Sequence, residues 1–419
     1  MMKAQKLDRR SFLKVAAVGT CGSLIHNVLT PGFAVRALAA PLSRAYSANP
    51  LLIVVNLSGG ASYQLAPIYH SAWRDKNPNV SYGPEESLPL TSEQGIHPSL
   101  TLIRDLYQDG DAILFNKVGF ANHSRSHSTA AEMWMTGHAS PMSKAGMLNQ
   151  LSCQMNGLFS AISLAGDDPI FEGSCSGARR LESLATLSGQ RFKNSDDETA
   201  WIDLTREEIT ALSSAPTNPN QQFARNAISS MDSAAQTIRD IAGNPLPDTG
   251  VPFNQTGFGN DCRDAARVIQ AAGVIGTHAI YLERGGFDTH SNERNSMPNS
   301  LTDVNNGLSA LVAVIKSLGR WNDTTIVIHS EFARTFENGS RGTDHGGPSP
   351  VYVMGGTVAG GRIGSPTPSN NEIASASGFL RGESVDARNL YYQIISGMGY
   401  NPAPIFTETF DRTNLGIYS

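Results

Sequence analysis

The sequence has few cysteines, no long low-complexity tract and no internal repeat. Four of its 419 residues are cysteine. Outside the N-terminal segment these are Cys153, Cys175 and Cys262, whose spacing does not match a metal-binding motif. Their odd number argues against a disulfide framework, although a bridge between Cys153 and Cys175 stays open. With 40% apolar residues, the composition is typical of a globular protein.

A basic surface is also missing. The formal net charge of the whole chain is −5, and residues 1–39 hold six Lys/Arg and one Asp, so the remainder carries about −10. An acidic surface without a stripe of basic and aromatic residues argues against nucleic acid as a partner.

The first 39 residues have the pattern of an export leader. The basic pair Arg9-Arg10 in "DRRSFLK" precedes a weakly apolar stretch, which ends at the small-residue pattern "ALA". That stretch is too short and too polar to form a stable membrane span. We expect residues 1–39 to be a twin-arginine signal peptide that the twin-arginine export machinery reads, residues 40–50 to be a linker, and the protein to be periplasmic or secreted.

From residue 51 onward, continuous apolar runs alternate with amphipathic segments, which predicts buried strands separated by helices. The expected strands lie at 51–57, 112–119, 277–283, 324–330 and 350–356, the last forming a hairpin with 361–365. The expected helices lie within 97–110, 126–137, 262–273, 300–319 and 386–396. This order predicts one α/β domain over residues 51–419, with a mostly parallel sheet sandwiched by helices.

The region from about 170 to 260 differs in character. It is rich in Ser, Asn, Gln and Asp and is interrupted by prolines, and we interpret it as an insertion or cap over the main domain. One amphipathic helix is expected within it.

Clusters of polar residues follow the expected strands. They are "SGGAS", "NHSRSHS", "RGGFDTH" and "SEFART", with "GTDHGG" on the loop after the last of these. Ligands of open α/β sheets bind beyond the carboxyl ends of the strands. If the strands are parallel neighbours, these clusters therefore converge on one rim.

Asp288 and His290 are two residues apart, so in an extended segment their side chains project to the same side. A carboxylate and an imidazole are ligands of zinc, manganese or iron. Asp344, His345 and Glu331 can complete such a site. The alternatives stay open: Asp288 and His290 can form a hydrogen-bonded turn, and Glu331 can act as a base or pair with Arg334.

The segment around His127 stands at the start of an expected helix, where free backbone N–H groups favour an anion. Arg125 can clamp phosphate or sulfate with its planar guanidinium. Ser126 can be a nucleophile only with an activating base or metal, and the alternative is an N-cap serine.

Together, "RSHS", "GGFDTHSN", "SEFART", "GTDHGG" and "MGGTVAGGRI" resemble motifs of the family called domain of unknown function 1501, which consists of exported bacterial proteins. The resemblance covers about residues 50–400. The family is grouped with the alkaline phosphatase and sulfatase superfamily. The resemblance thus implies an alkaline phosphatase-like fold, a bimetal site on the sheet, and a nucleophile at a helix start.

Matched to the superfamily pattern, Asp288, His290 and His345 correspond to the aspartate and two histidines of one metal site. The nucleophile position, counted back from Gly137 of "MTG", is His127, where the related enzymes carry Ser, Thr or Cys.

The second metal site of the pattern is incomplete here. Glu331 stands at the aspartate of an Asp-His pair, but Phe332 replaces the histidine. Ser62 or Ala61 stands where the first-strand aspartate would be. These departures from the pattern favour one metal site over two.

We expect an exported hydrolase that uses zinc or manganese to cleave a small anionic phosphate or sulfate ester. In this hypothesis His127 is a nucleophile or base, and Arg125 and Arg334 neutralise the anion. The alternative is a non-catalytic periplasmic binding or assembly protein that retains the phosphatase-like fold.

Overall fold

The computed structural model describes residues 49–418, apart from 143, 158, 166–168, 176, 181–183, 185–236 and 238–239. The expected signal peptide, most of the linker and most of the expected cap lie outside the described residues.

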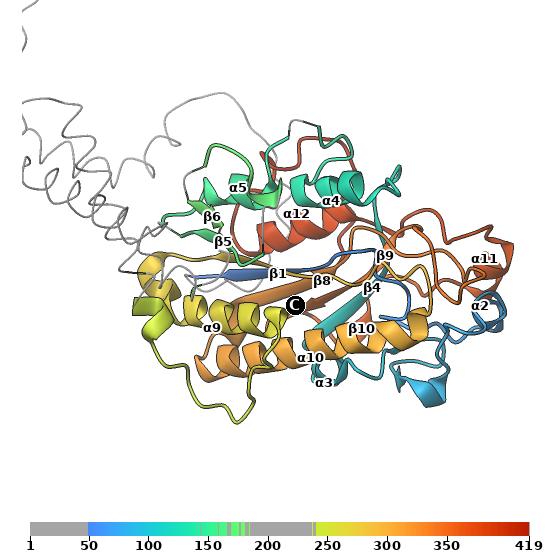
Figure 1. The fold of residues 1–419 in the computed structure, drawn as a ribbon. Helices are drawn as coiled ribbons and strands as arrows, with labels where there is room; N and C mark the ends of the chain where they lie inside the picture. The colour runs from blue at the N-terminus through green and yellow to red at the C-terminus, as the bar shows by residue number, and fades with distance from the viewer. Residues whose placement is uncertain are drawn as a thin grey trace, which may run out of the picture. The chain divides into compact units, whose positions relative to one another are not determined.

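A nine-stranded sheet, built from described residues, forms the centre of the protein (Figure 1). The strand order is β10-β4-β9-β8-β1-β7-β5-β6, and β11 also pairs with β4. Within this sheet β9 alone runs antiparallel to its neighbours, so the predicted mostly parallel sheet is confirmed. The strands are β1 (Leu51–Leu57), β4 (Ala112–Gly119), β5 (Ala161–Ser163), β6 (Ala178–Arg180), β7 (Ala279–Arg284), β8 (Thr324–His329), β9 (Ser349–Met354), β10 (Arg362–Ile363) and β11 (Val385–Asp386).

Helices cover both faces of the sheet (Figure 1). One face carries α3 (Thr101–Gln108), α9 (Gly257–Ile275) and α10 (Glu293–Ser317), and the other carries α4 (His127–Thr136), α5 (Met147–Ser152) and α12 (Ala387–Gly397). Successive residues of a strand point to opposite faces, so Leu51 and Ile53 pack with the first group and Leu52 and Val54 with the second. This two-sided burial explains the uninterrupted apolar run of β1.

Short elements lie outside these layers. Helix α2 (Ser71–Lys76) contacts α11 (Asn370–Ser375), where the backbone N–H of Ala72 donates to the side chain of Asn370 at 3.0 Å. Strands β2 (Leu88–Pro89) and β3 (Gly95–Ile96) form a separate antiparallel pair.

The predicted hairpin between 350–356 and 361–365 is wrong. Strand β10 pairs in parallel with β4, not with β9. Both edges of β9 are already occupied, by β4 and β8, so the chain after β9 can only pair elsewhere.

Helix α10 begins seven residues before the expected start at 300 and passes through Pro298. Proline has no N–H to donate to the carbonyl of Arg294. The hydroxyl of Tyr82 donates to that carbonyl instead, at 3.5 Å.

The antiparallel direction of β9 positions the long loop 330–348. The loop leaves the carboxyl end of β8 and returns to the amino end of β9, and both ends lie at the same rim of the sheet. The segments after β1 and β7 leave the sheet at this rim too, because β1, β7 and β8 are parallel neighbours.

Cys153 and Cys175 form the disulfide that the sequence left open, with their Cα atoms 5.2 Å apart, and Cys262 is free and buried. Strand β6 lies within the region of about 170–260 and extends the sheet beside β5. Residues 185–236 are not among those described, so the cap stays a prediction. In the described part of the chain, no helix is both long and apolar enough to cross a membrane.

Candidate metal centre

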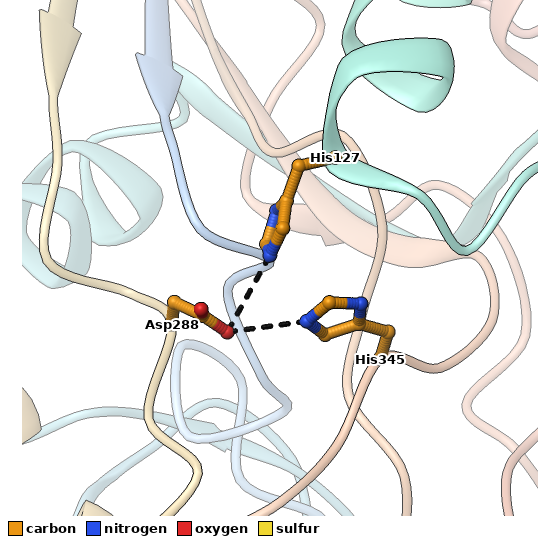
Figure 2. A group of neighbouring side chains, drawn as sticks. All are labelled: His127, Asp288 and His345. Atoms are coloured by element: carbon orange, nitrogen blue, oxygen red, sulfur yellow. Dashed lines mark hydrogen bonds and ion pairs between the residues drawn. The ribbon is translucent and has the colours of Figure 1, made fainter.

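Three loops of the rim bring His127, Asp288 and His345 together (Figure 2). One ligand atom from each lies within 4.8 Å of the others. His127 is the first residue of α4, Asp288 follows β7, and His345 lies on the loop between β8 and β9. The convergence predicted from the parallel sheet is therefore present.

A single oxygen, Oδ1 of Asp288, is the centre of the cluster. It lies 2.8 Å from Nε2 of His290, 3.3 Å from Nε2 of His345 and 3.5 Å from Nε2 of His127. Arg334 donates to the same oxygen at 2.7 Å. Three imidazoles thus present the same ring nitrogen to one carboxylate.

The other nitrogen, Nδ1, of each histidine contacts an oxygen. The distances are 2.7 Å from His127 to Glu331, 2.8 Å from His290 to Asp344, and 2.8 Å from His345 to the carbonyl of Arg125. Carboxylate and carbonyl oxygens only accept, so Nδ1 carries the hydrogen in each ring. In the neutral imidazoles the lone pair is then on Nε2.

These lone pairs point at an acceptor, which is unfavourable unless a cation or a proton lies between them. Nε2 of His127 is a buried atom without a hydrogen-bond partner. Nε2 of His290 lies 3.2 Å from Nε2 of His345. Ligands of tetrahedral zinc, each at about 2.0–2.1 Å from the ion, lie roughly 3.3 Å apart. The donor set therefore fits a transition metal ion.

The charges favour the same conclusion. Asp288, Glu331 and Asp344 contact the histidines, and Arg334 is the one guanidinium that contacts this carboxylate group in the described residues. Burial raises the pKa of Asp288, but the hydrogen bond and charge of Arg334 outweigh it and hold that pKa below its usual value. The hydrogen bond from His290 likewise lowers the pKa of Asp344. The ionised carboxylates outnumber the guanidinium, as a cation site requires.

Glu331 and Asp344 were predicted as ligands. Glu331 contacts Nδ1 of His127, and Asp344 contacts Nδ1 of His290. Glu331 is almost fully buried and accepts hydrogen bonds from the N–H of Gly59 and the hydroxyl of Ser330, both at 2.9 Å. Such outer partners orient ligand histidines and fix their tautomers. Direct coordination by Glu331 or Asp344 stays a prediction.

Arg334, predicted to neutralise a substrate anion, has a side chain that is 0% exposed. Its guanidinium donates to Asp288, to the carbonyl of Gly59 at 2.9 Å and to the carbonyl of Thr343. It therefore joins three segments of the rim and orients Asp288.

Arg125 and Ser126 lie at the edge of the cluster. Nε of Arg125 donates to the carbonyl of His345 at 2.7 Å, and its guanidinium lies over the ring of Phe379. Ser126 is the N-cap of α4, and its hydroxyl lies 3.2 Å from that of Ser128.

Phe332 packs against the cluster, with its ring centroid 5.0 Å from those of His127 and His345. An apolar ring therefore stands where the superfamily pattern has the histidine of a second metal site. Ser62 is buried; its hydroxyl accepts from the backbone N–H of Gln64 and is hydrogen-bonded to Glu293.

Sequence reasoning gave no role to Gly59, although "SGGAS" was noted. Its backbone N–H donates to Glu331 and its carbonyl accepts from Arg334. Its φ is +118°, and a Cβ there would overlap the backbone nitrogen of Asp288. Two glycines directly after a buried strand were the available signal for such a close approach.

We expect Gly59→Ala to displace Asp288 and to weaken metal binding. Gly110→Ala is a matched control, because Gly110 has a φ of +84° but open space around its Cβ. The control should cost about 1–2 kcal/mol of unfolding free energy through backbone strain. Gly59→Ala should cost at least about 2 kcal/mol more through overlap. Chemical denaturation measures the unfolding free energy of both variants. Equal losses of unfolding free energy would show that the contact of Gly59 with Asp288 is unimportant.

Several solved structures are similar to this chain in fold. The chain is similar to the PsFucS1 sulfatase from Pseudoalteromonas sp., at 12% identity and a TM-score of 0.41, over 88% of this chain and 73% of that chain. It is similar to the phosphonate monoester hydrolase of Agrobacterium radiobacter, at 11% identity and a TM-score of 0.36, over 87% and 78%. A protein in the alkaline phosphatase superfamily from Vibrio parahaemolyticus matches at 10% identity and a TM-score of 0.35, over 88% and 72%. Similarity this low transfers no activity to this chain.

No curated protein matches the sequence. A family model, described as Protein of unknown function (DUF1501), matches residues 175–414. This span includes Asp288, His290, Glu331 and His345, while His127 precedes it. Because the model matches more than half of the chain, the protein belongs to the DUF1501 family.

Proposed function

We propose that this protein is an exported, metal-dependent hydrolase of phosphoric or sulfuric esters. One divalent transition metal ion, zinc or manganese, would be held by Asp288, His290, His345 and His127. The observation that carries the proposal is the shared orientation of three imidazoles, each bonded to an oxygen through Nδ1 and directed at Asp288 through Nε2. Lone pairs gathered in this way are the arrangement of a ligand set.

A bound divalent metal at this position supplies Lewis acidity, which polarises an ester oxygen or lowers the pKa of a water molecule. The residues of this chain orient the side chains that would hold the metal. Arg334 and the backbone of Gly59 fix the Asp288 loop, and Asp344 fixes the ring of His290.

The start of α4 gives the centre an anion-binding element. None of the described side chains caps this helix, so N–H groups of its first turn are free to bind a substrate oxygen. The guanidinium of Arg125, at the same edge, adds a positive charge for a phosphate or sulfate group.

His127 combines two properties useful in ester cleavage. Glu331 accepts the hydrogen of its Nδ1, which leaves the lone pair on Nε2. That nitrogen can bind the ion, or it can take and return a proton next to it.

The proposal is tested by assaying purified protein with aryl phosphates and aryl sulfates, each with added zinc or manganese. We expect metal-dependent cleavage in the wild type and at least an about 100-fold loss of kcat/KM in His345→Ala, which lacks a ligand. His70→Ala, at the start of α2, should keep full activity.

Metal binding without cleavage of either ester class would instead support the non-catalytic alternative. The Phe332 ring beside His127 and His345 favours that alternative, because phenylalanine cannot bind a second ion as the histidine of the superfamily pattern would.

A further inference from the structure

A second group of buried polar side chains surrounds a cavity that Arg334 also lines. The cavity has a volume of about 10 Å³, which has room for roughly one water-sized occupant. Its walls include aromatic rings and a group of buried polar side chains. The polar ones used below are Ser62, Gln64, Glu293, Arg334 and Thr343.

Gln64 lines this cavity and has an unsatisfied side-chain oxygen. Its side-chain Nε2 donates to Oε1 of Glu293 at 2.9 Å, which identifies Nε2 as the nitrogen of the amide. Its Oε1 is buried and has no hydrogen-bond partner. Gln64 as a whole is 4% exposed, so bulk water does not satisfy this oxygen.

Glu293 brings a buried charge. It is 1% exposed, and in the described part of the chain no Lys, Arg or His nitrogen lies within ion-pair distance of its carboxylate. Its hydrogen-bond donors are neutral: the amide of Gln64 and the hydroxyls of Thr343, Ser62 and Thr289. Arg334 donates to Asp288 and to Thr343, and its positive charge acts on Glu293 without forming an ion pair with it.

A buried carboxylate without a counterion is costly and is normally neutralised by a proton or a cation. Burial accordingly raises the pKa of Glu293. The amino end of α10, where Glu293 is the first residue, offsets part of this cost. One small cavity thus has an acceptor oxygen, which needs a donor or a cation, and a carboxylate, which needs a positive charge.

We propose that this cavity binds one small, hard monovalent cation, Na⁺ or K⁺, between the carboxylate of Glu293 and Oε1 of Gln64. The hydroxyls of Ser62 and Thr343 lie in the same wall and complete an all-oxygen donor set. Oxygen ligands suit hard cations, and one carboxylate balances one positive charge. A single water molecule would satisfy Gln64 but would leave the charge of Glu293 unbalanced.

Arg334 connects this cation site to the metal centre. The chain of contacts runs from Glu293 through Thr343 to Arg334 and then to Asp288. The cation would therefore stabilise the position of Arg334, which donates a hydrogen bond to Asp288. Its binding does not depend on hydrolysis or on the metal proposed above.

The test compares the Tm of the full-length protein in chloride salts of sodium, potassium, caesium and choline at equal ionic strength. We expect Na⁺ or K⁺ to raise the Tm by on the order of 2 °C over choline, and Cs⁺ to have no effect because it is larger than the cavity. Glu293→Gln should abolish the difference. Glu337→Gln, at the surface beside Asn79, should keep it.

Crystals of the wild type soaked in thallium(I), a heavy K⁺ analogue, provide a readout that needs no variant. An anomalous peak between Glu293 and Gln64 is the expected result. Equal Tm values in all four salts, together with no peak there, would show that the occupant is water and would overturn the proposal.

Discussion

Asp288→Asn should give a folded protein whose metal affinity is lower by more than about 100-fold. The amide keeps an oxygen that can accept from Arg334, so the loop after β7 retains its anchor. It loses the charge around which three Nε2 atoms gather. The unfolding free energy should fall by only about 1–3 kcal/mol, because Arg334 keeps a neutral partner. Competition with a chromogenic chelator measures the affinity.

Asp344→Asn is the matched control for this prediction. Asp344 contacts His290 through Nδ1 at 2.8 Å and is placed to orient that ring. Loss of such an outer partner costs about 10–100-fold in affinity. A larger loss in Asp344→Asn than in Asp288→Asn would reverse the assignment of ligand and orienting residue.

Arg334→Ala should destabilise the protein by about 2–4 kcal/mol. The guanidinium is fully buried and serves Asp288 and the carbonyls of Gly59 and Thr343. Removing it leaves these acceptors without their donor. Denaturant unfolding measures the loss.

Arg125→Ala provides the comparison at an exposed position. Its side chain donates one hydrogen bond, to the carbonyl of His345, and its loss should cost less than about 1 kcal/mol. If the two arginine variants were equally stable, Arg334 would not have the anchoring role that its contacts indicate.

The sequence allowed the central strands to be predicted, because each is buried on both faces and appears as an uninterrupted apolar run. The bounds of β1 and β4 match the prediction. Strands β5 and β6 were missed because three residues are too few to show a pattern. The partner of β10 was misassigned because free sheet edges depend on contacts between distant segments.

For the site, the sequence predicted which residues gather at the rim better than it predicted how their side chains are oriented. The spacing of Asp288 and His290 and their place after a strand indicated the rim where both lie. The sequence could not indicate that Glu331 and Asp344 face the Nδ1 side of histidines. Nor could it indicate that Arg334 points inward, because this depends on Gly59 and Asp288 from other segments.

Metal analysis of the wild-type protein, purified with zinc and manganese supplied, tests the central claim most directly. Mass spectrometry gives the metal content, and X-ray absorption at the edge of the bound metal identifies the ligands. We predict one transition metal ion per chain, bound by histidine nitrogens and carboxylate oxygen. A protein that stays metal-free under these conditions, or an ion bound without histidine, would contradict the account.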